Sequence, residues 1–463
     1  MYYCFMNAFK AYDLNHWQDF LRHGLDSLLN LHNSAKDKKV PVLKPADVAH
    51  LTKEFQHLGG TYPKIELSEI LHYSNILMHP GYMGHQVVPP TLVSVLAGLI
   101  SNYLNQGMAV SDMGQSATAV ERAVIKRMLK HYGWEDGEGI MTSGGSLGNL
   151  TALLAARQSV SNMWEEGVDA NYCILVSADA HYCVDRAARI MGMGAKGVVK
   201  IAPNKNHKIG AAELNAALKE VASSGKKVLA VVGSACSTGP GVFDELEAIG
   251  TICNERKIWF HVDAAHGGML QLSAKYKSLL KGVELADSVV IDFHKMGFTP
   301  AITTAVLFRD EKSSYKTFSQ DASYLWSDMD FEPWTQSGLR TIECTKLMMG
   351  LKAYANLFWL GEEELVAMMD HLMDTTKEFA KIVADKKEWE LLHMPEANIL
   401  CFRHVSANDD QQLKALKEVI KKGRHYIVST KLNGKFYFRL SIMNVYTDLA
   451  VFNELLKKLE EQL

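Results

Sequence analysis

Lys295 is the residue of this sequence whose position best suits covalent chemistry. It follows the apolar run 288–291, so a predicted buried strand carries a lysine to its carboxyl end, directly after His294. Burial disfavours a charged ammonium and can lower the pKa of such a lysine, which leaves a neutral amine able to form a Schiff base with an aldehyde. Because most lysines at strand ends only add solubility, this interpretation depends on what the other segments carry.

A carboxylate follows a second predicted strand, residues 258–262. The two-residue period of a strand places Asp263 and His261 on the same face, and small residues follow up to Ala265. A carboxylate beside small side chains suits a flat ring with a cationic nitrogen. Two alternatives remain open: a metal site formed by His261, Asp263 and His266, and a structural aspartate bound by backbone amides.

Two more strand ends carry residues suited to binding. The stretch 142–149 reads Thr-Ser-Gly-Gly-Ser-Leu-Gly-Asn and precedes a predicted helix, so its small residues and the helix N-terminus could cradle a phosphate. It is neither a dinucleotide fingerprint nor a Walker A motif, and a plain strand-to-helix turn is the alternative. His181 ends the stretch 176–181 and could stack on a flat ligand, although a solvent-facing histidine in a capping loop is the simpler interpretation of that stretch alone.

Together these four segments favour one cofactor. A phosphate cradle, a stacking histidine, a carboxylate for a ring nitrogen and an amine occur in this order along the chain, each at a predicted strand end. Pyridoxal phosphate requires these four contacts from a protein. The sequence therefore predicts a pyridoxal-phosphate site, with no metal.

The elements that position these residues are predicted to form a mostly parallel sheet. From about residue 138, strand-like apolar runs alternate with amphipathic helical segments, which indicates a sheet covered on both faces with ligands bound at its carboxyl edge. The predicted strands are 139–141, 172–176, 197–201, 228–232, 258–262 and 288–291. The predicted helices between them are 147–157, 184–191, 211–223 and 243–255.

The two ends of the chain have other patterns. Helical periodicity covers residues 17–31, 91–104 and 117–132. After about residue 370, a helix, two strands at 398–403 and 436–442 and a closing helix from 448 predict a small α+β domain. We therefore expect a helical N-terminal segment (1–75), a large cofactor-binding domain (76–350) and a small C-terminal domain (351–463).

Composition excludes several classes of function. The 463 residues are 48% hydrophobic and 22% charged with a net charge of −3, which gives no electrostatic footprint for nucleic acid. No apolar stretch near a terminus is long enough to span a bilayer. Seven cysteines occur without paired spacing, which indicates free thiols in a reducing cytoplasm.

The region from about 75 to 345 resembles the group II pyridoxal-phosphate-dependent decarboxylases, which include the aromatic-amino-acid, glutamate, aspartate and diaminobutyrate decarboxylases. The matching residues are His79-Pro80, 143–146, His181, 236–238 with Phe243-Asp244, 261–265 and His294-Lys295. The resemblance implies an α/β protein of PLP fold type I, like aspartate aminotransferase, and a homodimer.

The resemblance also implies a role for each matching residue. Lys295 forms the Schiff base, and Asp263 pairs with the pyridine nitrogen. His181 stacks on one face of the ring and Ala265 packs against the other, with Thr238 near the ring substituents. Gly145 and Ser146 hold the phosphate, near His294. Tyr324 matches the proton donor on a mobile loop, although a surface tyrosine is the alternative, and Arg340 matches a family arginine that we expect at the substrate.

The substrate is predicted to be a small amino acid with a polar or charged side chain. His85 and Gln86 fall in a loop that resembles the family's substrate pocket, and both are polar. Cys236-Ser237 and His266 depart from the family pattern of Gly-Thr and an aromatic residue. We expect decarboxylation of aspartate, glutamate or diaminobutyrate to the amine and CO2. The alternatives are an aromatic-amino-acid decarboxylase, a PLP lyase or aldehyde synthase on the same fold, and a scaffold without activity.

Overall fold

The computed structural model describes residues 14–36, 41–42, 47–57, 63–160, 162–318, 320 and 332–463. The chain forms two compact units. The larger unit comprises residues 86–405 and 430–443, and the smaller comprises 1–85, 406–429 and 444–463. The division into 1–75, 76–350 and 351–463 stays a prediction, since compactness alone does not define a domain that folds by itself.

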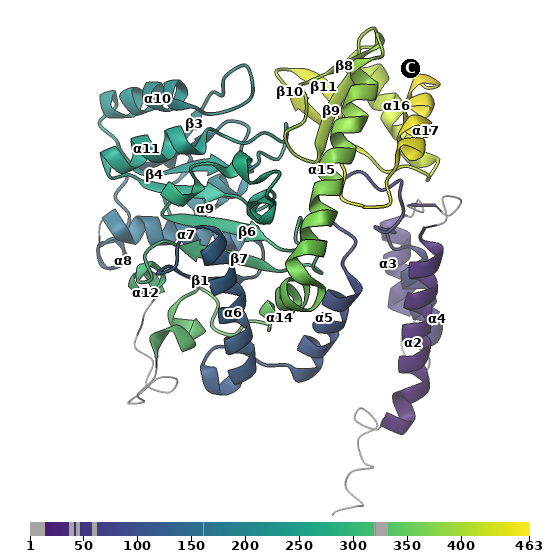
Figure 1. The fold of residues 1–463 in the computed structure, drawn as a ribbon, viewed down its shortest axis with the longest axis horizontal. Helices are drawn as coiled ribbons and strands as arrows, with labels where there is room; N and C mark the ends of the chain where they lie inside the picture. Colours follow the sequence, from purple (N-terminus) through teal and green to yellow (C-terminus); the bar gives the residue numbers. More distant parts are fainter. Residues whose placement is uncertain are drawn as a thin grey trace, which may run out of the picture. The chain divides into compact units, whose positions relative to one another are not determined.

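A seven-stranded sheet forms the centre of the larger unit (Figure 1). Its strand order is β1-β7-β6-β5-β4-β2-β3. The strands are β1 Glu138–Thr142, β2 Tyr172–Ser177, β3 Val198–Ile201, β4 Lys227–Ser234, β5 Trp259–Asp263, β6 Ser288–Asp292 and β7 Thr304–Phe308. The predicted strands correspond to β1–β6, and the neighbours from β6 to β3 are parallel. The sequence analysis missed β7, which pairs antiparallel with both β1 and β6.

Helices cover both faces of this sheet. Helix α7 (Gly145–Val160) packs on β4–β7 and against α9 (Cys183–Ile190) and α12 (Ser313–Phe318). Its leucines share a buried cluster with Ala230 and Val232 of β4. Gly233 lies on the opposite face of β4 from Ala230 and Val232. A Cβ placed on Gly233 would lie 3.0 Å from the Leu246 side chain, so this face is covered by α11 (Leu246–Arg256). The fold is therefore the predicted α/β class, with a mostly parallel sheet between helical layers.

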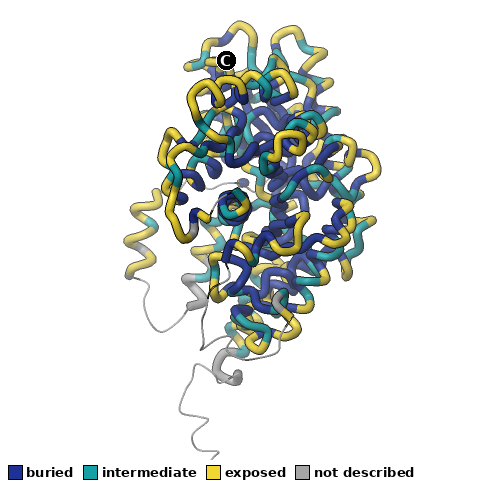
Figure 2. The backbone as a smooth tube through the Cα atoms, turned by 90° about the vertical axis from the view of Figure 1, so that its left-hand side faces the viewer, coloured by how far each residue is buried: buried dark blue, intermediate teal, exposed yellow. Residues whose placement is uncertain are grey.

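The remaining helices of the larger unit pack around this core. They are α5 Leu92–Leu104, α6 Gln115–His131, α8 Met163–Glu166, α10 Ala211–Ser223, α14 Gly350–Tyr354 and α15 Glu362–Ala384. Helix α6 packs on β1, α10 on β3 and β4, and α14 on α5 and α6. Figure 2 shows the buried stretches, in dark blue, gathered in the interior, with exposed stretches in yellow around them.

A second, antiparallel sheet has the order β10-β11-β9-β8. Its strands are β8 Trp389–Leu391, β9 Ile399–His404, β10 Val428–Leu432 and β11 Lys435–Ser441. The predicted strands 398–403 and 436–442 correspond to β9 and β11, and α15 packs on β8 and β9.

The smaller unit is helical. It contains α2 Leu14–Ser34, α3 Val48–His57, α4 Pro63–His72, α16 Asp409–Lys421 and α17 Leu449–Glu460. Helix α2 packs against α4, and α16 against α17. Within the described ranges, no helix of the chain combines the length and the hydropathy needed to cross a bilayer.

Candidate active site

A cavity of about 190 Å³ opens at the carboxyl ends of three neighbouring strands of the larger unit. Ser234, Asp263 and Asp292 end β4, β5 and β6, and all three line it. The cavity collects most of the residues that the sequence singled out. These are Gln86, Gly145, Ser146, His181, Thr238, Asp263, Ala265, His294 and Lys295.

Lys295 pairs with a carboxylate that the sequence analysis did not use. Its Nζ lies 3.0 Å from Oδ2 of Asp292, whose side chain is almost fully buried. Burial lowers the pKa of Lys295, but the carboxylates of Asp292 and Asp263 outweigh burial and raise that pKa. The expectation of a lowered pKa for Lys295 was therefore wrong, because the nearest charge is the Asp292 carboxylate, three residues earlier in the chain.

The Asp263 carboxylate is oriented by a backbone N–H of the turn that follows it and by the thiol of Cys183. Its Oδ1 accepts a hydrogen bond from the backbone N–H of Ala265 at 3.2 Å, and Cys183 Sγ lies 3.8 Å from its Oδ2. Burial raises the pKa of Cys183, and the nearby Asp263 carboxylate raises it further, so the thiol keeps its proton and donates weakly to the carboxylate.

His261 fixes the strand that carries Asp263. Its Nε2 lies 2.7 Å from Oδ1 of Asn149 on α7, and its Nδ1 lies 2.9 Å from Oγ of Ser288 on β6. Both ring nitrogens of this buried histidine thus have protein partners. No group of three or more His, Cys, Asp or Glu side chains in the described part of the chain is arranged to hold a metal ion.

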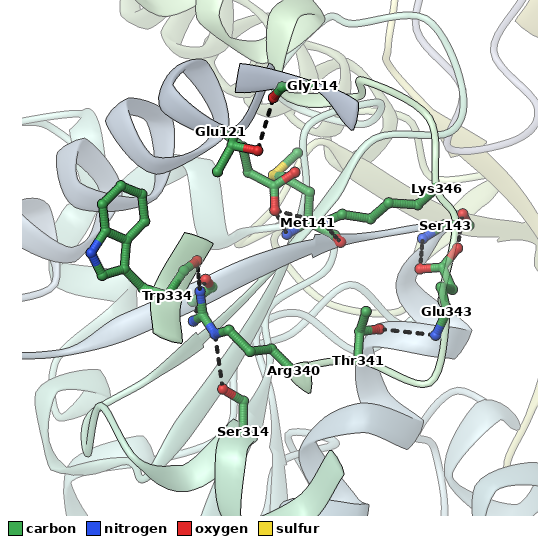
Figure 3. Close-up of polar contacts among 12 residues, drawn as sticks. Gly114, Glu121, Met141, Ser143, Ser314, Trp334, Arg340, Thr341, Glu343 and Lys346 are labelled. Carbon is green, nitrogen blue, oxygen red and sulfur yellow. Dashed lines mark hydrogen bonds and ion pairs between the residues drawn. The ribbon is translucent and has the colours of Figure 1, made fainter. Parts of the chain in front are cut away.

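The turn between β1 and α7 has the geometry of an anion cradle. Gly144 adopts a φ of +99°, which favours glycine, and α7 begins at Gly145. A Cβ on Gly145 would lie 2.9 Å from Oδ2 of Asp292, so only glycine leaves room there. Glu343 accepts hydrogen bonds from the backbone N–H and the hydroxyl of Ser143, which ties this turn to the segment after residue 332 (Figure 3).

His181 lies just before α9 and lines the same cavity. Its Nδ1 accepts the backbone N–H of Cys183 at 3.3 Å. Burial lowers the pKa of His181, although the charge of Asp263 opposes this, so a neutral imidazole with its proton on Nε2 is favoured. His181 therefore lines the cavity and also makes a capping contact at the start of α9, and its stacking role stays a prediction.

Arg340 lies outside the set of residues that line this cavity. Figure 3 shows its guanidinium among backbone and hydroxyl groups. It donates to the carbonyl of Gly139 at 2.9 Å, the carbonyl of Trp334 at 3.3 Å and the hydroxyl of Ser314 at 3.3 Å. These contacts join β1, α12 and the segment after residue 332. The structure therefore gives Arg340 an anchoring position instead of the expected place at the substrate.

Two other predicted residues are not among the described residues of the larger unit. His85 belongs to the smaller unit, where its Nε2 lies 3.1 Å from the hydroxyl of Tyr426. Tyr324 lies outside the described residues, so its role as proton donor stays a prediction.

Sequence reasoning also missed Arg439 of β11. Arg439, like Arg340, is not itself a lining residue of the cavity, but it contacts two residues that are. Its guanidinium donates to the carbonyl of Thr238 at 2.7 Å and to Oε1 of Gln86 at 3.3 Å. The signal was present in Phe436-Tyr-Phe-Arg-Leu-Ser-Ile442, where a single cation interrupts an otherwise largely apolar strand. A buried charge in such a strand needs a partner.

The residues present fit pyridoxal 5'-phosphate. The N-terminus of α7 at Gly145 suits the phosphate, and Asp263 suits a cationic ring nitrogen. Lys295 supplies the amine in the same cavity. Fold and site together define a PLP-dependent enzyme of fold type I.

Comparisons with known proteins specify the family. Residues 43–405 match the pyridoxal-dependent decarboxylase conserved domain, so the chain belongs to this family of amino-acid decarboxylases and uses pyridoxal phosphate. It is 26% identical over 455 residues to an aromatic-L-amino-acid decarboxylase of Bacillus atrophaeus, with 94% of this chain and 93% of the relative covered. It is 30% identical over 380 residues to an L-2,4-diaminobutyrate decarboxylase of Acinetobacter baumannii, with 77% and 74% covered. The crystal structure of mouse CSAD has the same fold, with a TM-score of 0.90, 22% identity and coverage of 97% of this chain and 99% of that one.

Proposed function

We propose that this decarboxylase acts on an acidic amino acid, aspartate or glutamate, and that Arg439 binds the side-chain carboxylate of the substrate. One observation carries the proposal. Arg439 is only 6% exposed, and no ion pair joins it to a carboxylate among the described residues. Burial lowers the pKa of Arg439, yet a guanidinium keeps its charge in proteins. A buried cation beside the cavity wall is stabilised by an anion that arrives with the substrate.

The side-chain carboxylate suits this position better than the α-carboxylate. The α-carboxylate leaves as neutral CO2, so a cation bound to it would stabilise the ground state and slow the reaction. The side-chain carboxylate keeps its charge throughout the reaction, so Arg439 would bind it equally well in the ground state and in the transition state. This contact would position the substrate without raising the barrier to decarboxylation. Gln86, in contact with Arg439, adds an amide to the same wall.

The chain's own residues have distinct roles in this proposal. Lys295 would hold the cofactor covalently through its Nζ and would give it up to the substrate amine. Asp263 would keep a proton on the ring nitrogen, and His181 and Ala265 would hold the ring. Gly145, Ser146 and His294 would hold the phosphate, and Thr238 would orient the ring substituents. When bound, the cofactor supplies an electron sink for the bond that breaks at Cα. Tyr324 returns the proton to Cα.

The side-by-side activity on aspartate, glutamate, 2,4-diaminobutyrate and aromatic amino acids tests the substrate. Arg439→Gln should raise KM for the preferred acid about 10- to 100-fold, as expected for a lost charge-assisted hydrogen bond, while leaving cofactor absorbance unchanged. Arg439→Lys is the matched variant that keeps the positive charge, and it should raise KM less than Arg439→Gln does. Equal KM values for wild type and Arg439→Gln would contradict the proposal. Lys295→Ala should abolish the visible absorbance of the bound cofactor, and its persistence would exclude Lys295.

A second candidate substrate is L-2,4-diaminobutyrate, which the 30%-identical relative is named for. Its side-chain ammonium would be repelled by Arg439, so preference for this substrate would exclude our role for Arg439. The aromatic-amino-acid alternative and the lyase or aldehyde-synthase alternative are separated from decarboxylation by measuring CO2 and primary amine against aldehyde and hydrogen peroxide.

We further propose a homodimer formed through α5. This helix buries small residues, Ser94, Ala97, Gly98 and Ser101, and exposes large apolar ones, including Leu99 at 65% and Tyr103 at 88%. An apolar face of this kind is typical of an interface between subunits. Sedimentation should show a dimer that Leu99→Glu weakens. Leu413→Glu, at an exposed position of α16, should leave the dimer unchanged.

We also assign the protein to the cytoplasm. The support is the free state of the described cysteines, Cys173, Cys183, Cys236, Cys253, Cys344 and Cys401. Cell fractionation tests this, and recovery from an oxidising compartment would contradict it.

A further inference from the structure

Asp292 lies between two groups that the cofactor site uses. Its Oδ2 is 3.0 Å from Nζ of Lys295, and the same oxygen would lie 2.9 Å from a Cβ placed on Gly145 at the start of α7. Its Oδ1 accepts a hydrogen bond of 2.5 Å from the hydroxyl of Thr304 on β7. The buried carboxylate therefore faces the reacting amine and the N-terminal end of the helix through one oxygen and is fixed through the other.

The groups around Asp292 in this structure favour its ionised form. Burial raises the pKa of Asp292, but Lys295, His294 and the Thr304 hydroxyl outweigh burial and lower it. His294 Nε2 lies 3.6 Å from Oδ2. The other titratable groups that face this region are His181 and Cys183 from the α9 end, and Asp263 and His266 from β5 and its following turn.

We propose that Asp292 takes up a proton from solvent when the cofactor binds and releases it when the cofactor leaves, so that cofactor affinity depends on pH through this one residue. The inference rests on the cofactor site proposed above. The proton binds Oδ2, because Oδ1 keeps the hydroxyl of Thr304 as its donor. No other reactant is required: a carboxylate and a solvent proton become a carboxylic acid.

Two changes on binding disfavour the carboxylate. The amine of Lys295 would be engaged by its covalent bond to the cofactor, so it would no longer be the free ammonium that pairs with Oδ2. The phosphate brings negative charge to the helix start at Gly145, which lies against that same oxygen. A carboxylate that loses a cation and gains an anionic neighbour has a raised pKa. Once protonated, Oδ2 becomes a donor and can hydrogen-bond a phosphate oxygen.

The test is cofactor binding, measured without turnover. The dissociation constant of pyridoxal 5'-phosphate is determined by absorbance titration from pH 5.5 to 9 for wild type, Asp292→Asn, Asp292→Ser and Asp287→Asn. Asp287 is the matched control: it precedes the same strand β6 at its other end, where it pairs with Arg309 at 2.6 Å. Calorimetry in buffers of different ionisation enthalpy counts the protons taken up. Circular dichroism identifies the variants that fold. Asp292→Asn and Asp292→Ser are both included so that the test remains possible if one of them fails to fold.

Asp292 should have a lower pKa in the cofactor-free protein than in the cofactor complex. Between these two pKa values, the ratio of the wild-type dissociation constant to that of either neutral variant should rise about tenfold per pH unit. Calorimetry should count up to one proton more for wild type than for Asp292→Asn, and Asp287→Asn should behave as wild type. Parallel pH profiles for wild type and the neutral variants would overturn the role of Asp292 while leaving the cofactor site intact. A wild type that binds no cofactor at any pH would overturn both.

Discussion

Nε2 of His266 lies 2.7 Å from Oδ1 of Asn398, and this contact fixes which ring nitrogen of the histidine carries the proton. The amide nitrogen of Asn398 donates to the carbonyl of Ile442 at 2.8 Å, so its oxygen must accept. His266 therefore donates from Nε2 and leaves Nδ1 as a lone-pair acceptor, and no partner of Nδ1 is present among the described residues. This imidazole replaces the aromatic ring that the family pattern has at this position.

The buried His266 should make the protein sensitive to acid. Burial lowers the pKa of His266 from 6.5 to about 3, so the unfolded chain takes up a proton below pH 6.5 that the folded protein does not bind. The free energy of unfolding should therefore fall as pH drops from 6.5 toward 3, by about 1.4 kcal/mol per pH unit from this residue. Denaturant unfolding of His266→Phe between pH 7 and 4 should show a shallower loss than wild type. His50→Phe, at an exposed position, should keep the wild-type slope, and identical slopes for all three proteins would contradict the prediction.

Removing one partner of the buried Lys346–Glu121 pair should destabilise the larger unit. Nζ of Lys346 lies 2.6 Å from Oε1 of Glu121 and 2.8 Å from the carbonyl of Met141 (Figure 3). The Lys346 side chain is fully buried, so Lys346→Met leaves an unpaired carboxylate and should cost about 3–5 kcal/mol in denaturant unfolding. Adding Glu121→Gln keeps the oxygen that accepts from the N–H of Met141 and should recover much of the loss. A double variant no more stable than Lys346→Met would show that the charge is not the cause.

Adding one methyl group at Gly145 should weaken cofactor binding. The new Cβ would lie 2.9 Å from Oδ2 of Asp292, closer than a Cβ approaches a non-bonded heavy atom in folded proteins, so the helix start or the carboxylate must shift. Gly145→Ala should raise the dissociation constant of pyridoxal 5'-phosphate on the order of tenfold, as expected for local overpacking. Gly24→Ala meets only Leu67 at 3.7 Å and serves as the control. Unchanged binding by Gly145→Ala would place the phosphate elsewhere.

Tyr324→Phe should change the product. If Tyr324 donates the proton to Cα, its loss leaves a carbanion equivalent exposed to oxygen, and aldehyde with hydrogen peroxide should replace part of the primary amine. Chromatography of the amine and a peroxidase assay of the peroxide measure the ratio. Tyr446→Phe, a change of the same chemistry at an exposed position, should leave the ratio unchanged. A wild-type ratio in Tyr324→Phe would assign the proton to another residue.

The local pattern of the chain determined the parts of the site that follow strand ends. Asp263, Lys295 and His181 could be predicted because each lies at the end of an apolar strand or a few residues beyond it, and parallel strands bring their carboxyl ends to one edge of a sheet. The glycine–serine turn at 144–146 was predicted for the same reason. The position of β7 could not be predicted, because a short apolar run does not indicate whether it pairs parallel or antiparallel, or with which strands.

Only the tertiary structure decided the electrostatics. Asp292 was visible three residues before Lys295, but whether its carboxylate turned toward the amine depended on Thr304 of β7, which holds its other oxygen. Arg439 is 201 residues from Thr238 in sequence, yet donates to its carbonyl, and Arg340 is 201 residues from Gly139. Periodicity predicts which face of an element a side chain occupies, but the charge that it meets there belongs to another element, and that distance is set only when the elements pack.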